Sequence, residues 1–283
     1  MTRRSVEEVI FKVLMYLATC VVVGSLLLLL AIITIKGARA LDLDMITKIP
    51  TGGYYLGKEG GVLNAIVGSL LLALGATVLA TLLALPVVLF LQNDYAGRTW
   101  LAGVVRTALD LLWGIPSIVY GAFGFSILLF LGMRASLLGG IIALTLVEFP
   151  IMARAMDEVL RMIPRELKEA SYAIGATRWE TMRVVVVRQA MPGLVTAVLL
   201  AFGRGIGDAA SVLFTAGYTD NLPRSLMDPV ASLPLAVFFQ LGTPFPEVQA
   251  RAHASALILL IIVLFVSIIA RLCGARLSRF AVK

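Results

Sequence analysis

Charge, cysteine and histidine are all scarce in this chain of 283 residues. Only 14% of the residues are charged, against about 25% in soluble domains. The two cysteines, Cys20 and Cys273, stand far apart in apolar runs, so we expect buried apolar side chains and neither a disulfide framework nor a zinc site. No catalytic triad or metal cluster can be assembled around the single histidine, His253. The sequence therefore predicts no catalytic and no metal site on this chain.

Apolar residues fill the space that charge leaves: 60% of the chain is hydrophobic and the mean hydropathy is +0.97. Six uncharged or nearly uncharged runs are long enough to cross about 30 Å of hydrocarbon, at 12–35, 62–91, 111–132, 136–156, 191–216 and 252–272. The first run is longer than the apolar part of a signal peptide, so we expect it to be retained. The sequence predicts an all-α integral membrane protein with six transmembrane helices.

The distribution of Lys and Arg orients these helices. Basic residues concentrate on the cytoplasmic side of a membrane, and most of the 24 Lys and Arg residues fall on one side if both termini are cytoplasmic. Residues 157–190 then form the longest cytoplasmic segment. On the outer side, "ASLPLAVFFQL" (231–241) is too short to span and predicts an interfacial or re-entrant helix. No basic patch is interleaved with aromatic residues, so nucleic acid is not an expected partner.

The segment 157–190 is polar and rich in helix formers, and it reads as two short helices around a turn. Pro164 is suited to start a helix and Gly175 to stop one. The residues alone leave two interpretations open, a solvated connector and a surface on which a partner docks.

Within that segment, "EASYAIG" (169–175) resembles the EAA loop of ABC-transporter permeases. Glu169, Ala170 and Gly175 match the loop's pattern, and Ser171 replaces its second alanine. The resemblance implies a coupling helix that sits in a groove of a cytoplasmic ATPase subunit. The chain departs from the pattern at Val187-Arg188, where the family has Leu-Pro.

Three further stretches narrow the resemblance: "GIPSIVYGAFGF" (114–125), "RGIGDAASVLFTAG" (204–217) and "MDPVASLPLAVFF" (227–239). Together they are similar to the PstA-type permeases of phosphate ABC importers, over roughly residues 60–272. This implies the type I ABC importer permease fold and the inward transport of inorganic phosphate by alternating access. The expected location is the plasma membrane of a prokaryote, or the inner membrane where an outer membrane is present.

The same resemblance implies an assembly. Its expected members are a PstC-like sister permease, two ABC ATPase subunits and an extracytoplasmic phosphate-binding protein, surrounded by membrane lipid. The chain itself is then not an enzyme and needs no cofactor, since ATP and Mg²⁺ are bound by the ATPase. "GGYYLGKE" (52–59) is not read as a phosphate-binding loop, because Glu59 stands where Ser or Thr is needed.

The expected organisation has three parts. Residues 1–60 hold the cytoplasmic N-terminus, the first transmembrane helix and an outer loop. Residues 61–275 form the permease core, with the EAA coupling loop at about 157–190, and residues 276–283 form a cytoplasmic tail.

A few ionisable residues fall inside the apolar runs. A charge at the bilayer centre costs about 2.5–3.5 kcal/mol on insertion scales, so it normally faces protein or water. Arg204 and Asp208 are four residues apart, and on a continuous helix they would share a face and pair. The pair alone is equally suited to a structural role and to an anion site. The resemblance implies that Arg204, Asp208 and Arg154 lie on the phosphate path, with Asp208 standing where the family usually has Glu.

Other features of these runs are less specific. Glu148 precedes Pro150 and could pair loosely with Arg154, and Gly203 with Gly207 forms a G-x-x-x-G pattern typical of close helix packing. Three alternative functions stay open. The chain could be a permease for another oxyanion such as molybdate or sulfate, an ion-coupled secondary transporter, or a membrane scaffold.

Overall fold

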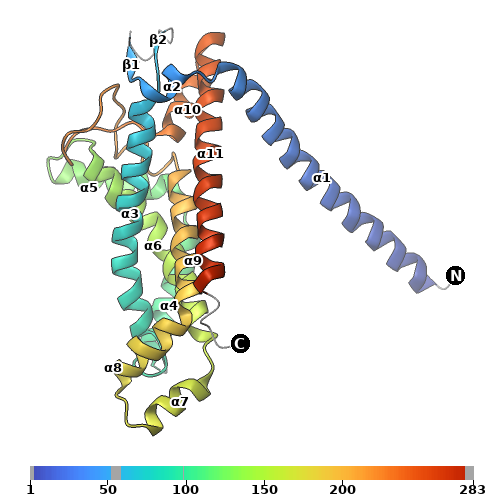
Figure 1. The fold of residues 1–283 in the computed structure, drawn as a ribbon, viewed down its shortest axis with the longest axis vertical. Helices are drawn as coiled ribbons and strands as arrows, with labels where there is room; N and C mark the ends of the chain where they lie inside the picture. The colour runs from blue at the N-terminus through green and yellow to red at the C-terminus, as the bar shows by residue number, and fades with distance from the viewer. Residues whose placement is uncertain (1–2, 52–58, 98, 278–283) are drawn as a thin grey trace.

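The computed structural model describes residues 3–51, 59–97 and 99–277, which form a bundle of helices with one short hairpin of two strands (Figure 1). The elements in chain order are α1 (Arg3–Ala40), α2 (Leu43–Thr47), β1 (Pro50–Thr51), β2 (Glu59–Gly60), α3 (Leu63–Phe90), α4 (Trp100–Gly114), α5 (Ser117–Phe130), α6 (Leu137–Arg161), α7 (Arg165–Ala173), α8 (Arg178–Glu180), the π-helix η1 (Thr181–Val186), α9 (Val187–Ile206), α10 (Leu233–Leu241) and α11 (Pro246–Leu277). The antiparallel β1–β2 hairpin marks one end of the bundle and α7 marks the other.

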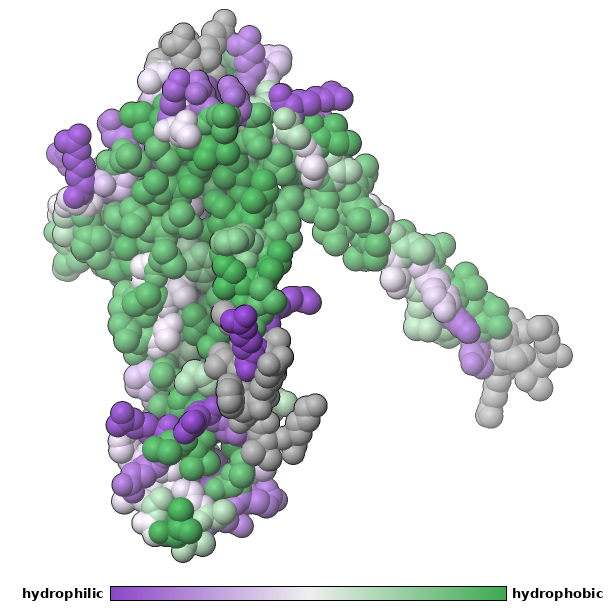
Figure 2. Space-filling view, in the orientation of Figure 1, coloured by the Kyte–Doolittle hydropathy of each residue, from purple (hydrophilic) through white to green (hydrophobic). Residues whose placement is uncertain are grey.

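Among the residues that the structure describes, five helical stretches are long and apolar enough to cross a membrane: the greater part of α1, α3, α6, the stretch Arg178–Ile206, and α11 up to Leu272. Helices α4 and α5 meet the same test together but are bent by 100° at a short break, the geometry of either a broken span or a re-entrant loop. Figure 2 shows apolar side chains over the middle of the visible face and hydrophilic residues gathered toward its ends. The prediction of a helical, multi-pass membrane protein is confirmed.

Two of the predicted spans differ from the structure. The run expected at 111–132 is broken, because Pro116 holds the preceding residue, Ile115, in an extended conformation with ψ at 130°. The run expected at 191–216 is shifted, since the helical stretch starts at Arg178 and ends at Ile206. Hydropathy detects the apolar character of a segment and not the place where its helix ends.

Helices α3 and α6 form the centre of the bundle. Ala73, Ala76, Ala80 and Ala84 of α3 are fully buried, and their spacing of three or four residues places them on one face. Side chains this small let two helices approach closely, which is how helices associate in a membrane. Met152 of α6 packs in the same core cluster as Ala80 and Ala84. The centre is therefore held by close packing of small residues on α3.

Helix α1 leaves the bundle at the β1–β2 end and leans away from it (Figure 1). It contacts α11 near its own end, where a Cβ built on Gly37 would lie 2.7 Å from the main-chain oxygen of His253. The apolar window that qualifies it as a span is 0% buried within this chain, so lipid or another chain covers it. Cys20, expected to be buried, is exposed on this helix, and the side chain of Cys273 lies outside the described set.

Helix α10 is the short helix predicted over 231–241. Ser232 caps it by accepting a hydrogen bond from the main-chain N–H of Leu235, and the N–H of Leu233 donates to Ser69 Oγ of α3 at 2.8 Å. Leu233, Leu235 and Ala236 are fully buried. Of the two predicted placements, burial against α3 and α11 favours a helix that enters the protein over one that lies on its surface.

We expect Gly68→Ala to destabilise the contact between α3 and the segment before α10. A Cβ built on Gly68 would lie 1.9 Å from the main-chain oxygen of Ala231, which cannot move without displacing α10. Overpacking of this kind costs about 1–3 kcal/mol, and thermal unfolding of the protein in detergent measures it. Gly103→Ala is the matched control, because nothing lies within 4 Å of its built Cβ. Equal unfolding temperatures for the two variants would contradict the expected clash.

Candidate functional site

Arg204 lies in the last turn of α9, at a place where this helix stops inside the bundle. The backbone of Gly205 packs against Glu148, which is in the middle of α6, and Figure 1 shows α9 ending partway along α11. Gly207 caps the helix. The end of α9 thus places Arg204 next to Gly205, which packs against the middle of α6.

The surroundings of Arg204 are open. Its side chain is exposed and makes no hydrogen bond or ion pair with any other residue that the structure describes. It lines a groove of about 820 Å³ between α9 and α11, together with Thr196, Gly203, Ser267 and Arg271 among others. A mid-membrane arginine cannot face lipid tails cheaply, so in the membrane this face of α9 is turned toward water or toward another chain.

The predicted ion pair between Arg204 and Asp208 does not form. Because α9 ends at Ile206, the two residues are not on a continuous helix. Asp208 instead closes the turn that follows, where its Oδ2 accepts hydrogen bonds from Ser211 N at 2.8 Å and Ser211 Oγ at 2.5 Å. Among the described residues, nothing lies within 4 Å of a Cβ built on Gly203, and a Cβ on Gly207 would meet only main-chain oxygens of α9 itself, so this pattern packs against no other described helix.

Glu148 is a fully buried acid beside this site. Its Oε2 accepts a hydrogen bond from Thr77 Oγ1 of α3 at 2.9 Å, while its Oε1 has no partner among the described residues. A Cβ on Gly205 would lie 1.8 Å from Oε1, so only glycine fits there beside the acid. Asp208 lies nearby, since its main-chain N–H donates to the oxygen of Gly205 at 3.1 Å. Sequence reasoning gave Glu148 the wrong partner, because its contacts come from α3 and α9.

Arg154 lies apart from Arg204, about two helical turns before the end of α6. Its guanidinium pairs with Asp110 of α4 at 3.2 Å and with Glu158 at 3.1 Å. Both carboxylates are about half exposed, and the arginine side chain is 26% exposed. The structure therefore places Arg204 and Asp208 at the end of α9, where Gly205 packs against Glu148, and places Arg154 nearer the α7 end with its own acidic partners.

A second polar cluster, which the sequence did not reveal, joins α4 to α6 near the α7 end. Asp157 is 1% exposed and accepts hydrogen bonds from Arg106 Nε at 2.8 Å and from Gln92 Nε2 at 3.1 Å. Arg106 also donates to the main-chain oxygen of Leu91 at 2.6 Å. The residues lie in three separate segments of the chain. The only sign of this cluster in the sequence is therefore Asp157, an acid that follows an apolar run.

The segment predicted as two short helices around a turn has that form. Helix α7 begins directly after Pro164 and ends before Gly175, whose φ is +87°. The N–H of Gly175 donates to Tyr172 O at 3.0 Å, and the N–H of Ala176 donates to Ser171 O at 3.2 Å. This is the pattern of a glycine-terminated helix. We refer to α7, the turn and α8 (165–180) as the coupling hairpin, after the role that the sequence resemblance implies.

The coupling hairpin projects from the end of the bundle, and the residues of the predicted motif lie on its exposed surface. Glu169, Ala170 and Gly175 are all exposed, and so is Ile174, at 86%. From α8 the chain continues through η1 into α9 without leaving helical geometry. The Val187-Arg188 difference from the family pattern falls at the start of α9, directly after η1. The hairpin is thus continuous with the helix that carries Arg204.

Asp94, in the loop between α3 and α4, binds the coupling hairpin from the side. Its two carboxylate oxygens accept hydrogen bonds from Lys168 Nζ and Tyr172 Oη, each at 2.8 Å. Burial alone would raise the pKa of Asp94, but these hydrogen bonds and the charge of Lys168 outweigh it and lower the pKa. Burial, and then the hydrogen bond to Asp94, raise the pKa of Tyr172 to about 12. The carboxylate therefore stays charged and bound at neutral pH.

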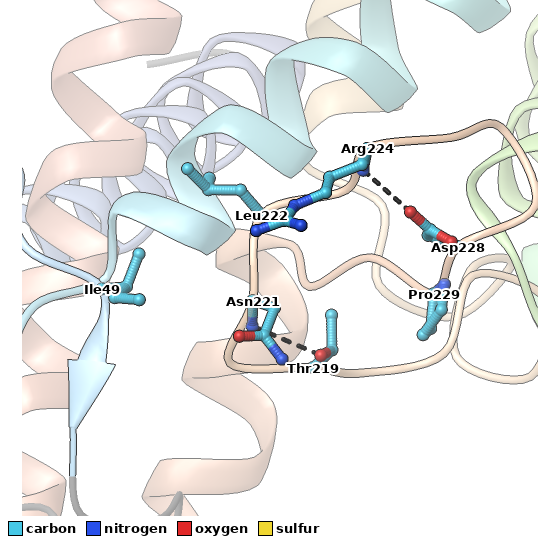
Figure 3. A pocket seen from close by; sticks show the side chains of 7 residues that line it. All are labelled: Ile49, Thr219, Asn221, Leu222, Arg224, Asp228 and Pro229. Carbon is cyan, nitrogen blue, oxygen red and sulfur yellow. Dashed lines mark hydrogen bonds between the residues drawn. The ribbon is translucent and has the colours of Figure 1, made fainter.

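A cavity of about 720 Å³ opens at the β1–β2 end (Figure 3). Its lining comes mostly from the loop between α9 and α10: Ile49, Thr219, Asn221, Leu222, Arg224, Asp228 and Pro229. Asp228 Oδ2 accepts hydrogen bonds from the main-chain N–H groups of Arg224 and Ser225 at 2.8 and 2.9 Å. The cavity contains none of the residues predicted for the site.

Comparison with known proteins agrees with this architecture. Residues 95–279 match the family described as "Binding-protein-dependent transport system inner membrane component". The chain is 35% identical to the phosphate transport system permease protein PstA of Yersinia pestis, over 85% of this chain and 81% of that protein. It is 37% identical to PstA 1 of Mycobacterium tuberculosis, over 75% of this chain and 69% of that protein.

Among solved structures, a chain of the MetNI methionine ABC transporter in an inward-facing conformation aligns with a TM-score of 0.64. The two chains are 21% identical, and the alignment covers 76% of this chain and 95% of that one. At this identity the likeness concerns the fold, which is that of an ABC importer permease. With the family match and the identity to phosphate permeases, it follows that this chain belongs to the PstA family of phosphate transport permeases.

Proposed function

We propose that this chain moves inorganic phosphate inward by alternating access, as the permease subunit of an ATP-driven importer, and that the anion passes Arg204. The observation that carries this assignment is an arginine inside the membrane that is exposed to a groove and has no partner among the described residues. A guanidinium offers a planar set of donors that matches the oxygens of phosphate. A scaffold would have no use for such a charge.

The nearby acids are better suited to a site that binds and releases an anion than to a site that holds it tightly. Asp208 and Glu148 lie at the end of α9 without neutralising Arg204 directly. The negative charge of Asp208 opposes that of an anion near Arg204, and Coulomb interactions are strong where water is scarce. An anion would therefore be bound at Arg204 but not trapped. Arg154 would meet the anion nearer the α7 end, in competition with Asp110 and Glu158.

The proposed assembly assigns a side to each end of the bundle. The coupling hairpin would dock on a cytoplasmic ATPase subunit through Glu169, Ala170 and Gly175, which are all exposed. Two such ATPases would supply ATP and Mg²⁺. A PstC-like sister permease would complete the path, and an extracytoplasmic phosphate-binding protein would dock at the β1–β2 end. Both termini would then be cytoplasmic in the plasma membrane, or in the inner membrane of a cell with two membranes.

Uptake of labelled phosphate into proteoliposomes that hold the full complex tests this function. We expect uptake that requires ATP and the binding protein and that unlabelled phosphate suppresses. Preferential suppression by molybdate or sulfate would assign another oxyanion and contradict phosphate. Uptake by the permeases without the ATPase, driven by an ion gradient, would point to a secondary transporter.

We expect Gly175→Ala to weaken docking of the ATPase on the hairpin. A φ of +87° is unfavourable for a residue with a Cβ, at about 1–2 kcal/mol, and nothing lies within 4 Å of that Cβ. Within this chain the effect therefore comes from the backbone and not from a clash. Binding of purified ATPase to the permease pair in detergent measures it. Gly175→Asn should be milder, because Asn tolerates this backbone region, and equal weakening by both variants would contradict a backbone cause.

A further inference from the structure

We propose that Asp94 is a positioning residue that joins the coupling hairpin to the loop after α3, so that movement of the ATPase reaches α3 and α9 together. The inference rests on the proposed function, because it concerns how the coupling hairpin passes that movement on. It assigns a role to a loop that lies outside the EAA motif.

Asp94 holds both arms of the hairpin. Its carboxylate accepts from Lys168 and Tyr172 on α7, and its main-chain oxygen accepts from Arg178 on α8 at 3.1 Å. The side chains of Asp94 and Lys168 are only 15% and 14% exposed, although they lie at the end of the bundle. Charge-assisted hydrogen bonds that water does not reach freely are among the stronger ones in proteins. The connection between the loop after α3 and the coupling hairpin is therefore rigid.

The loop that carries Asp94 is itself stiff. Within it, the N–H groups of Tyr95 and Gly97 both donate to Gln92 O, at 3.0 and 2.9 Å. The side chain of Gln92 in turn donates to the buried Asp157 of α6. A force on the hairpin therefore passes through Asp94 into the end of α3 and into the cluster that ties α3, α4 and α6 together.

The hairpin is thus connected to the spanning helices by two routes. One runs along the chain, from α8 through η1 to α9 and Arg204. The other runs through Asp94 to α3, whose Thr77 contacts Glu148. The two routes meet again at the centre of the bundle, where Glu148 packs against Gly205 of α9. Asp94 adds a direct connection from the hairpin to the end of α3, beside the indirect one through the core in which α9 packs against α3.

The test measures phosphate transported per ATP hydrolysed in proteoliposomes that hold the full complex. Asp94→Asn keeps the shape of the side chain and removes its charge. We expect its ratio to fall about tenfold, the factor that corresponds to about 1.4 kcal/mol, which is close to the lower end of the range for hydrogen bonds to charged groups, about 1.5–3 kcal/mol. ATP hydrolysis itself should persist. Asp44→Asn is the matched control, because Asp44 also pairs with a lysine, Lys48 at 2.6 Å, but stands near the β1–β2 end.

Exchanging the charges of Asp94 and Lys168 distinguishes a positioning role from a general effect on stability. The double variant Asp94→Lys with Lys168→Asp should recover part of the lost ratio, whereas each single variant should not. An unchanged ratio in an assembled Asp94→Asn complex would overturn the proposal. If that variant does not assemble, Tyr172→Phe removes one hydrogen bond only, and an unchanged ratio there would overturn it equally. Failure of the native complex to couple ATP to uptake would instead refute the proposed function.

Discussion

Replacing Arg204 with glutamine is expected to lower ATP-driven phosphate uptake between about tenfold and a hundredfold, while the complex still assembles. The factor corresponds to the loss of a hydrogen-bonded charge, at about 1.5–3 kcal/mol. Assembly should survive because Arg204 makes no hydrogen bond or ion pair with any residue that the structure describes. Initial rates in proteoliposomes, with the unfolding temperature from the same preparation, measure both effects.

Two further variants sharpen this expectation. Arg204→Lys keeps the charge but not the planar set of donors, so it should fall between the native protein and Arg204→Gln. Arg188→Gln removes an exposed arginine at the other end of α9 and should transport normally. Native uptake by Arg204→Gln would remove this residue from the anion path and make Arg154 the next candidate.

Asp157→Ala is expected to cause the largest loss of stability. The substitution leaves the guanidinium of Arg106, which is 14% exposed, without its carboxylate. Breaking a buried ion pair from one side costs about 3–5 kcal/mol. Gln92 would lose a partner as well, so the contact between the loop after α3 and α6 would weaken. Thermal unfolding in detergent, followed by the intrinsic fluorescence of the three tryptophans, should show the loss.

Asp110→Ala is the matched comparison for this prediction. It also removes an acid that pairs with an arginine near the α7 end, but the side chain of Asp110 is 50% exposed. Exposed ion pairs are worth about 0–1 kcal/mol, so the unfolding temperature should change little. A similar loss of stability in both variants would contradict the importance of burial for the Arg106–Asp157 pair.

Much of the architecture follows from local features of the sequence. Long uncharged runs must be helical in a membrane, since only helices and closed barrels satisfy every backbone group there. Pro164 and Gly175 limited α7 because proline and glycine act on the backbone conformation of their own residues and close neighbours. The short helix predicted at 231–241 from the length of its apolar run is present, and Ser232 and Pro234 mark its start. The motif at 169–175 could likewise be identified from residues that are consecutive in the sequence.

Only the tertiary structure decided which polar groups meet. Asp208 was expected to pair with Arg204, yet α9 ends between them, and Asp208 binds Ser211 instead. Asp94 and Tyr172, Gln92 and Asp157, and Thr77 and Glu148 are each separated by more than sixty residues. Such pairs depend on how helices pack and where they stop, and both are set by contacts across the bundle. Helix periodicity carries no information about those contacts, so the site's neighbours appear only once the helices are placed side by side.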